Sequence, residues 1–361
     1  MSVRFHTLTI ADVRRETPDA IAITFAVPDD LKPVFQYKQG QYITVRVDVD
    51  GVSHRRNYSL CSSPVLDEPL TIGVKRINDG VVSGWLNDRV RVGDSIEVYP
   101  PMGNFTRELQ PDHARHYVLF GGGSGITPLL SILKSILRVE PGSVVTLLYA
   151  NRNEASIMFD GQLQKLRTDY GDRLRIVHIL EDTASSAREA IAGRMEPDTV
   201  RTLIRSWVPD PAISEFFICG PQGMMQGILD VLHERGVDDR HIHREYFTLT
   251  KDDMEQRDQV APTDAGDEIV TRTVTVRLYG QEHTFEVHPD ETILTAAIRE
   301  NVDPPFACQI GACCTCRAKL TTGRVVMDER EALSDDEMEE GYILTCQSHP
   351  LTDGCFADYD Q

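Results

Sequence analysis

Four cysteines toward the C-terminal end of the chain constrain its fold more than any other feature. Cys308, Cys313, Cys316 and Cys346 follow the spacing C-x4-C-x2-C-x29-C, which is the ligand spacing of plant-type 2Fe–2S clusters. Such a cluster needs four thiolates, three of them in one tight loop. Structural zinc is the alternative, but zinc sites usually contain two close cysteine pairs, and this run contains one. The spacing therefore predicts a 2Fe–2S cluster held by these four residues.

The remaining composition is that of a globular protein. Its 361 residues, 41% hydrophobic and 26% charged, suffice for two or three domains. No segment approaches the roughly 18 apolar residues of a membrane span, and the first residues alternate like a strand rather than a signal peptide. Because six of the eight cysteines follow residue 300 and no export signal is seen, metal binding is favoured over disulfides. We expect a cytoplasmic protein.

Charge is distributed unevenly along the chain. Residues 248–361 carry 24 acidic and 9 basic side chains, whereas the first 247 residues carry 32 and 28. Nucleic acid is excluded as an expected partner, because its phosphates repel such a field. The acidic part would steer a partner protein with a basic patch, or it would serve solubility alone.

Hydrophobic patterning divides the chain into three domains. Residues 1–112 contain short alternating segments separated by turns, which predict a small antiparallel β-barrel. In residues 113–247, apolar strands alternate with amphipathic helices, as in a parallel α/β sheet. Residues 248–270 are polar and predict a linker. Residues 271–361 contain a hairpin with its turn near Gly280, a helix and the cysteine loop, and predict an α+β domain.

The first domain contains a candidate flavin site. A flavin dinucleotide needs a cation and a helix N-terminus for its pyrophosphate, an aromatic ring against the isoalloxazine, and a hydroxyl near its reactive N5. Arg56, Tyr58 and Ser59 on one strand, and the turn that opens the helix near Ser83, supply these groups. An exposed arginine and a half-buried tyrosine are also common on ordinary strands, and Lys75 is either a further contact or a solvated lysine. The candidate flavin-binding residues are Arg56, Tyr58, Ser59, Lys75, Gly80, Val82 and Ser83.

The second domain contains a candidate nicotinamide site. A strand runs into the glycine turn G-x-G-x-x-P, formed by Gly123, Gly125 and Pro128, and then into a helix expected to open at this proline. Glycines permit close approach of the backbone, and the helix dipole favours a phosphate. A later strand ends in Cys219-Gly220-Pro221, where nucleotide sites form in parallel sheets. The alternatives are an ordinary strand–helix turn and a buried core thiol.

Arg152 follows another strand of this domain, in the segment YANRNE. It would meet a 2′-phosphate and favour NADPH over NADH, or it is simply an exposed loop arginine. The sequence therefore predicts NAD(P)H as the reductant and leaves the choice between the two nucleotides open.

In this order the motifs resemble the ferredoxin–NADP reductase superfamily with a C-terminal plant-type ferredoxin domain. The resemblance covers essentially the whole chain and is strongest to oxygenase reductase components, namely those of phenylacetyl-CoA epoxidase and ketosteroid 9α-hydroxylase. The shared segments are RRNYSLCSSP, GGGSGITP, YANR, FFICGP, REYF and CQIGACCTC. The resemblance implies a β-grasp fold for the third domain, and FAD rather than FMN, because GVVSGWL lacks the glycine-rich FMN motif.

The resemblance also implies roles for individual residues. Ser59, Cys219 and Glu245 would be catalytic, Thr127 and Cys219-Gly220-Pro221 would border the nicotinamide, and Phe247 would lie beside the flavin. NAD(P)H would reduce FAD, which would pass single electrons to the cluster.

The resemblance further implies a separate oxygenase as the acceptor, of Rieske or di-iron type. A reductase of a small acceptor such as a quinone or ferric chelate, and a 2Fe–2S redox sensor, are the alternatives.

Overall fold

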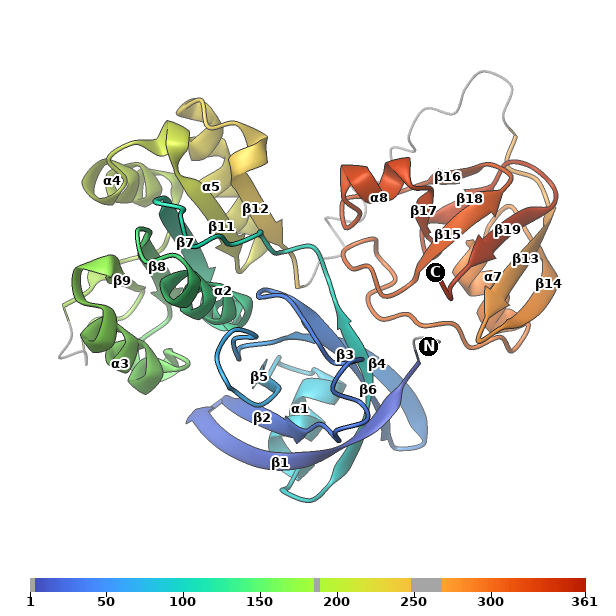
Figure 1. Ribbon diagram of the computed structural model, residues 1–361, viewed down its shortest axis with the longest axis horizontal. Helices are drawn as coiled ribbons and strands as arrows, with labels where there is room; N and C mark the ends of the chain where they lie inside the picture. The colour runs from blue at the N-terminus through green and yellow to red at the C-terminus, as the bar shows by residue number, and fades with distance from the viewer. Residues whose placement is uncertain (1–3, 185–188, 248–267) are drawn as a thin grey trace.

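The computed structural model describes residues 4–184, 189–247 and 268–361, which form three bodies built on separate main sheets (Figure 1). Most of the expected linker, 248–270, lies outside the described residues. In the described part of the chain, no helix has the length and apolar character needed to cross a membrane.

The first sheet is an antiparallel barrel, as predicted. Its strand order is β4-β3-β6-β1-β2-β5, and a bridge between Leu60 and Ile72 joins its two ends. Helix α1 (Val81–Arg89) contributes Val82 and Leu86 to the barrel core. The strands are β1 (His6–Thr17), β2 (Ala20–Ala26), β3 (Tyr42–Val49), β4 (Val52–Ser59), β5 (Thr71–Lys75) and β6 (Ser95–Met102).

The second sheet is parallel, which confirms the predicted α/β domain. Its strand order is β10-β9-β8-β7-β11-β12. Side chains of β7 alternate between two cores: Tyr117 and Leu119 pack with α2 and α3, whereas Val118 and Phe120 pack with α4 and α5. The strands are β7 (His116–Gly122), β8 (Val144–Asn151), β9 (Leu174–Leu180), β10 (Ile191–Ala192), β11 (Glu215–Cys219) and β12 (Ile242–Glu245). The helices are α2 (Ile126–Val139), α3 (Asp160–Tyr170), α4 (Pro197–Trp207) and α5 (Gln222–Glu234).

The third body has a mixed sheet of order β14-β13-β19-β15-β17. Its first hairpin turns at Tyr279 and Gly280, where both φ angles are positive, at 54° and 76°, as tight hairpin turns require. The strands are β13 (Arg272–Leu278), β14 (Gln281–Val287), β15 (Arg317–Thr322), β16 (Val325–Met327), β17 (Tyr342–Leu344), β18 (Ser348–Pro350) and β19 (Cys355–Asp358). The helices are α7 (Ile293–Arg299) and α8 (Asp335–Glu339).

The barrel and the parallel sheet share one hydrophobic core. Ala20, Ala22 and Phe105 of the barrel side belong to the same buried cluster as the inner face of α2. At its edge the Ser131 hydroxyl of α2 donates to the Ser62 carbonyl at 2.6 Å. These two domains therefore form a single packed unit.

The third body contacts the barrel through charged and polar groups and through a small apolar cluster that includes Tyr42 and Cys313. Arg46 and Arg55, on neighbouring strands, both pair with Asp303. Arg55 is buried and also donates to the Pro304 carbonyl at 2.9 Å. The ring of Phe5, just before β1, lies 4.4 Å from the Arg46 guanidinium at the same face, and Figure 1 shows the start of the chain beside the third body.

Candidate electron-transfer site

The four predicted ligand cysteines lie together in the third body as two pairs of thiols. Cys308 hydrogen-bonds Cys313, and Cys316 hydrogen-bonds Cys346. The bond from Cys308 lowers the pKa of Cys313 to about 6, and the bond from Cys316 lowers the pKa of Cys346. Among the described residues, no group of three or more His, Cys, Asp or Glu side chains is arranged around a single ion position. The four cysteines would supply the four thiolates that a 2Fe–2S cluster needs.

The backbone around these sulfurs is arranged to stabilise thiolates. The Ile310 N–H donates to Cys308 Sγ at 3.5 Å, and the Gln347 amide donates to Cys346 Sγ at 3.6 Å. Gly311 has φ +72°, and a Cβ there would lie 2.5 Å from Glu329 Cγ, so a side chain would disrupt the loop. Donors to sulfur are what cluster thiolates need, and the loop fits a 2Fe–2S cluster.

The two other cysteines of this domain point elsewhere. Cys314 Sγ donates to the Ala332 carbonyl at 2.8 Å, and Cys355 Sγ donates to the Thr352 carbonyl at 3.2 Å. Both thiols are buried and hydrogen-bonded to backbone carbonyls, as packed side chains are.

Strand β4 presents the predicted flavin residues at the edge of the barrel. Arg56 is exposed and donates to the Arg55 carbonyl at 2.7 Å. Tyr58 is half-buried, and Ser59 is buried. The Ser59 hydroxyl donates to Glu245 Oε2 at 3.0 Å across the domain interface.

The three residues expected to be catalytic converge from three strands. Glu245 ends β12 and is in register with Cys219, the last residue of β11, while β4 contributes Ser59. Burial raises the pKa of Glu245 to about 8, although part of the side chain is open to solvent, and burial also raises the pKa of the Cys219 thiol. Phe247, two residues further, is 42% exposed. A pKa near 8 would leave the carboxyl of Glu245 protonated at neutral pH.

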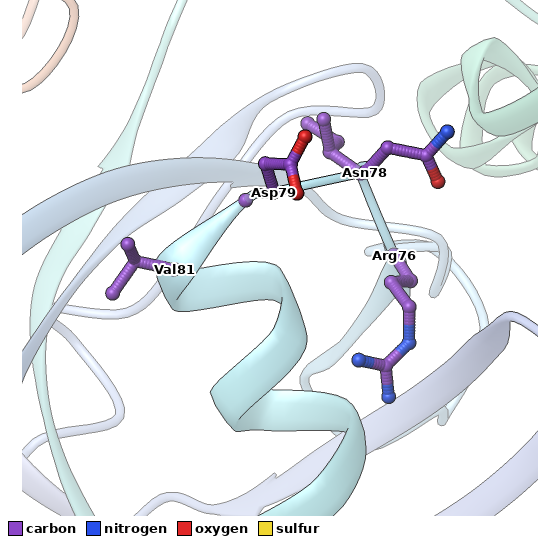
Figure 2. A pocket seen from close by; sticks show the side chains of 6 residues that line it. Arg76, Asn78, Asp79 and Val81 are labelled. Atoms are coloured by element: carbon purple, nitrogen blue, oxygen red, sulfur yellow. The ribbon is translucent and has the colours of Figure 1, made fainter.

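The N-terminus of α1 is a second part of this edge. Gly80 is the N-cap and offers no side-chain oxygen, so the first N–H groups of the helix, which include that of Val82, are free for an anion. An open hollow of about 520 Å³ adjoins it, lined by residues 76–81 (Figure 2). The Ser83 hydroxyl accepts from the Ile77 N–H at 3.0 Å and donates to the Gly80 carbonyl at 3.3 Å. Ser83 thus shapes the turn with its hydroxyl.

The glycine turn and the Cys219-Gly220-Pro221 segment lie directly against each other. A Cβ on Gly125 would lie 2.0 Å from the Cys219 carbonyl oxygen, and one on Gly220 would lie 3.0 Å from Gly122 Cα. The sequence therefore needs glycine at these positions so that two backbones can approach. Helix α2 begins at Ile126, two residues before Pro128, which corrects the expected start.

The same turn faces the barrel. The methyl group of Thr127 packs against Gly73 of β5. A Cβ on Gly73 would lie only 2.4 Å from this methyl carbon. The ammonium group of Lys75 lies beside Gly123, and 4.0 Å from Asp19 Oδ2.

Arg152 reaches the same carboxylate, with 3.1 Å between its Nη2 and Asp19 Oδ2. Two cations thus share one carboxylate beside the glycine turn. This excess of positive charge suits nucleotide phosphates.

Strand β4, which carries the predicted flavin residues, is called the flavin strand below, and the loop that carries Cys308, Cys313 and Cys316 is called the cluster loop. Sequence reasoning missed the residues that join the two. Tyr42 of β3 is the register partner of Ser59, and its hydroxyl accepts from the Cys314 N–H at 3.0 Å. Asn57, inside the predicted flavin motif, accepts from Thr44, which lies 3.3 Å from Thr315. The strand alternation of RRNYS would have shown that Asn57 faces away from its neighbours Arg56 and Tyr58.

Comparison with known proteins supports three domains of known type. Residues 7–106 match the oxidoreductase FAD-binding domain, residues 119–230 the oxidoreductase NAD-binding domain, and residues 276–351 the 2Fe-2S iron-sulfur cluster binding domain. These matches confirm FAD, a nicotinamide nucleotide and a 2Fe–2S cluster as the cofactors.

Full-length relatives share the same arrangement. The chain is 36% identical to one of the subunits of the 1,2-phenylacetyl-CoA epoxidase of Escherichia coli, over 99% of this chain and 98% of the relative. It is 37% identical to the ferredoxin reductase component of 3-ketosteroid-9-alpha-monooxygenase of Rhodococcus rhodochrous, over 96% and 94%.

Solved structures show the same fold. Phthalate dioxygenase reductase superimposes with a TM-score of 0.58 at 24% identity, over 98% of both chains. An intact self-sufficient cytochrome P450 monooxygenase superimposes with a TM-score of 0.69 at 22% identity, and this chain spans 41% of its length.

Proposed function

We propose, from the premise that this chain belongs to the family of FAD-, NAD- and 2Fe–2S-binding oxidoreductases found in these relatives, that it is the reductase component of a multicomponent oxygenase. It takes electrons from NAD(P)H and passes them through FAD and a 2Fe–2S cluster to a separate oxygenase. The observation that carries the proposal is the position of β4. Its Ser59 meets Glu245 of the nucleotide domain, while Tyr42, the cross-strand partner of Ser59, contacts the cluster loop.

The nucleotide domain would bind and orient the reductant. Backbone N–H groups at the glycine turn, with Lys75 and Arg152 nearby, would hold the phosphates. Thr127 and the Cys219-Gly220-Pro221 segment would border the nicotinamide, because Thr127 faces Gly73 of the barrel and the segment packs against the glycine turn.

The barrel would hold FAD. Arg56 and the N-terminus of α1 would contact its pyrophosphate, and Tyr58 would pack against the ring. FAD, when bound, supplies the conversion of a two-electron donor into single electrons. Ser59 and the protonated carboxyl of Glu245 would hold a proton in a defined place beside the flavin.

The cluster would be held by Cys308, Cys313, Cys316 and Cys346. We place its acceptor among the Rieske-type and di-iron oxygenases, since the relatives are named as components of an epoxidase and a monooxygenase. No two of the eight cysteines form a disulfide, and we infer the reducing cytoplasm as the compartment.

Anaerobic titration with NADH and with NADPH tests this proposal. The flavin absorbance should bleach first and the cluster absorbance should follow, with the electrons then appearing in an added oxygenase. Flavin bleaching with a cluster that stays oxidised would reject the internal route. Rapid turnover with quinones and none with oxygenases would favour a small-acceptor reductase, and slow turnover with every acceptor would favour a redox sensor.

A further inference from the structure

The hydroxyl of Tyr42 links the flavin strand to the cluster loop. Tyr42 starts β3, and its register partner across the sheet is Ser59. The side chain is 6% exposed. Its oxygen accepts from the Cys314 N–H at 3.0 Å and lies 3.3 Å from Thr315 Oγ1. One phenol therefore contacts both residues that follow the ligand Cys313.

Thr315 forms a second link beside it. Its hydroxyl lies 3.5 Å from Cys313 Sγ and 3.3 Å from Thr44 Oγ1, and Thr44 donates to Asn57 Oδ1 at 2.8 Å. A sulfur that binds iron as a thiolate accepts hydrogen bonds and does not donate them. Thr315 is then the group that donates to Cys313.

The two thiol pairs differ in their surroundings. Cys308 and Cys313 share a small apolar cluster with Tyr42 and Met102 of the barrel. Cys316 and Cys346 pack instead with leucines of their own domain. The ring of Tyr42 also rests against Gly103, where a Cβ would lie 2.9 Å from it, so the barrel is shaped to hold this ring.

We propose that Tyr42 is a positioning residue for electron transfer: its hydroxyl fixes the loop Cys313–Cys316 against the flavin strand, so that Cys308 and Cys313 would be the cluster ligands on the side that faces the barrel. This inference rests on the proposed function. NAD(P)H gives up two electrons and becomes NAD(P)+, with one proton released to solvent. FAD and the cluster, when bound, would pass these electrons on one at a time, so two single-electron transfers to the oxygenase would balance each NAD(P)H oxidised.

Tyr42→Phe in the full-length protein with FAD and cluster tests the proposal, because it removes the hydroxyl and keeps the ring. In anaerobic rapid mixing with NADPH or NADH, flavin reduction should keep its wild-type rate. Cluster reduction should slow by about fivefold, as expected when a buried N–H loses its acceptor. Hydrogen–deuterium exchange should become faster in the segment around Cys314, which is a readout independent of turnover.

Tyr359→Phe is the matched control. Tyr359 is equally buried and donates to Thr345 at 2.8 Å, next to the ligand Cys346 and outside the apolar cluster of Tyr42, Cys308 and Cys313. Cluster reduction in this variant should stay at the wild-type rate. Wild-type cluster reduction in Tyr42→Phe, or equal slowing in Tyr359→Phe, would overturn the proposal.

Thr315→Val and Thr315→Ser provide a second test of the proposal in case the Tyr42→Phe variant does not fold. The valine variant should slow cluster reduction and alter the electron paramagnetic resonance signal of the dithionite-reduced cluster, and serine should restore both. If valine changes neither, the proposal fails. A wild-type protein whose cluster NAD(P)H cannot reduce would instead refute the proposed function, so the two failures are distinguishable.

Discussion

The barrel contacts its two neighbouring domains in different ways. Against the parallel sheet it forms one continuous apolar core, which includes Ala20, Ala22 and Phe105. Against the third body it offers a small apolar cluster around Tyr42 and a charged contact in which Arg46 and Arg55 share Asp303. The first contact resembles a domain interior, whereas the second resembles a separable protein–protein interface.

This difference corresponds to the two chemical steps. Hydride transfer needs the donor carbon and the acceptor nitrogen in contact, so misplacement by an ångström is costly, and a shared core holds both nucleotide sites rigidly. An electron passes between centres that do not touch, so the third body tolerates a weaker contact. We therefore expect mutations to separate the two steps.

Removing a cluster ligand should have the largest effect, because it should abolish the second step and leave flavin reduction intact. Cys313→Ala should lose the cluster and all electron transfer to the oxygenase, while reduction of the flavin by NAD(P)H continues at the wild-type rate. The visible spectrum, the iron content and rapid-mixing traces measure this. Cys314→Ala, the adjacent thiol that bonds the Ala332 carbonyl, should keep its cluster. Loss of flavin reduction in Cys313→Ala would show that the domains are not separable.

Changing the proton-holding carboxyl should impair the other step. Glu245→Gln should slow flavin reduction by about 10- to 100-fold, with electron transfer from the chemically reduced flavin to the cluster unchanged. Ser59→Ala should act in the same direction because it removes the partner of Glu245. Equal slowing of flavin reduction and of electron transfer to the cluster would contradict the assignment of the two steps to different domain contacts.

The same carboxyl predicts a pH dependence of stability. Its pKa is about 8 in the folded protein, and about 4.3 when unfolded. Between these values the folded state binds the extra proton, so stability falls as pH rises through this window. Thermal unfolding at several pH values should show that Glu245→Gln lacks this part of the fall. Parallel curves for the two proteins would contradict it.

The close approach of backbones in the nucleotide domain predicts a smaller effect. Gly125→Ala would push a methyl group into the Cys219 carbonyl, so it should destabilise the protein by about 1–3 kcal/mol and raise the KM for NAD(P)H. Gly161→Ala in α3, with open space around its Cβ position, should leave both almost unchanged. Chemical denaturation and steady-state kinetics measure these effects.

Weakening the ion pairs of Asp303 with Arg46 and Arg55 should have the smallest effect on cluster reduction. Asp303→Asn should slow cluster reduction by about threefold, and added salt should reduce the difference from wild type, because the ion pairs are screened. Arg201→Ala, which removes exposed ion pairs with Asp198 and Glu234, should have no effect on this step. A large effect of Asp303→Asn on flavin reduction would argue against two independent contacts.

Local patterns in the sequence were sufficient to predict the fold of each domain, but they did not predict the contacts between domains. The cysteine spacing, the strand alternation and the glycine turns are set by neighbouring residues, and the predicted fold class is confirmed. The bond from Ser59 to Glu245 joins residues 186 positions apart, and only resemblance to a family pointed to that carboxyl. Local sequence patterns do not indicate contacts between residues so far apart in the chain.

The motif RRNYS illustrates why some contacts escape prediction. The chemistry of Arg56 suits a flavin pyrophosphate, yet its neighbour Arg55 is the buried cation that meets Asp303. Adjacent strand residues face opposite sides, so Arg56 lies on the face opposite to the arginine that contacts the third body. The role of Tyr42 depends on docking between domains, which no local pattern specifies.

The position of Phe5 bears on how such a protein is assembled. Its ring covers Arg46 at the surface that receives the third body, so the start of the barrel strand β1 opens onto the same surface that the cluster domain reaches from the other end of the chain. A cluster module fused ahead of β1 would meet the same landing surface. We therefore expect a rearranged protein, with the cluster domain joined ahead of β1, to form the same contact with the barrel.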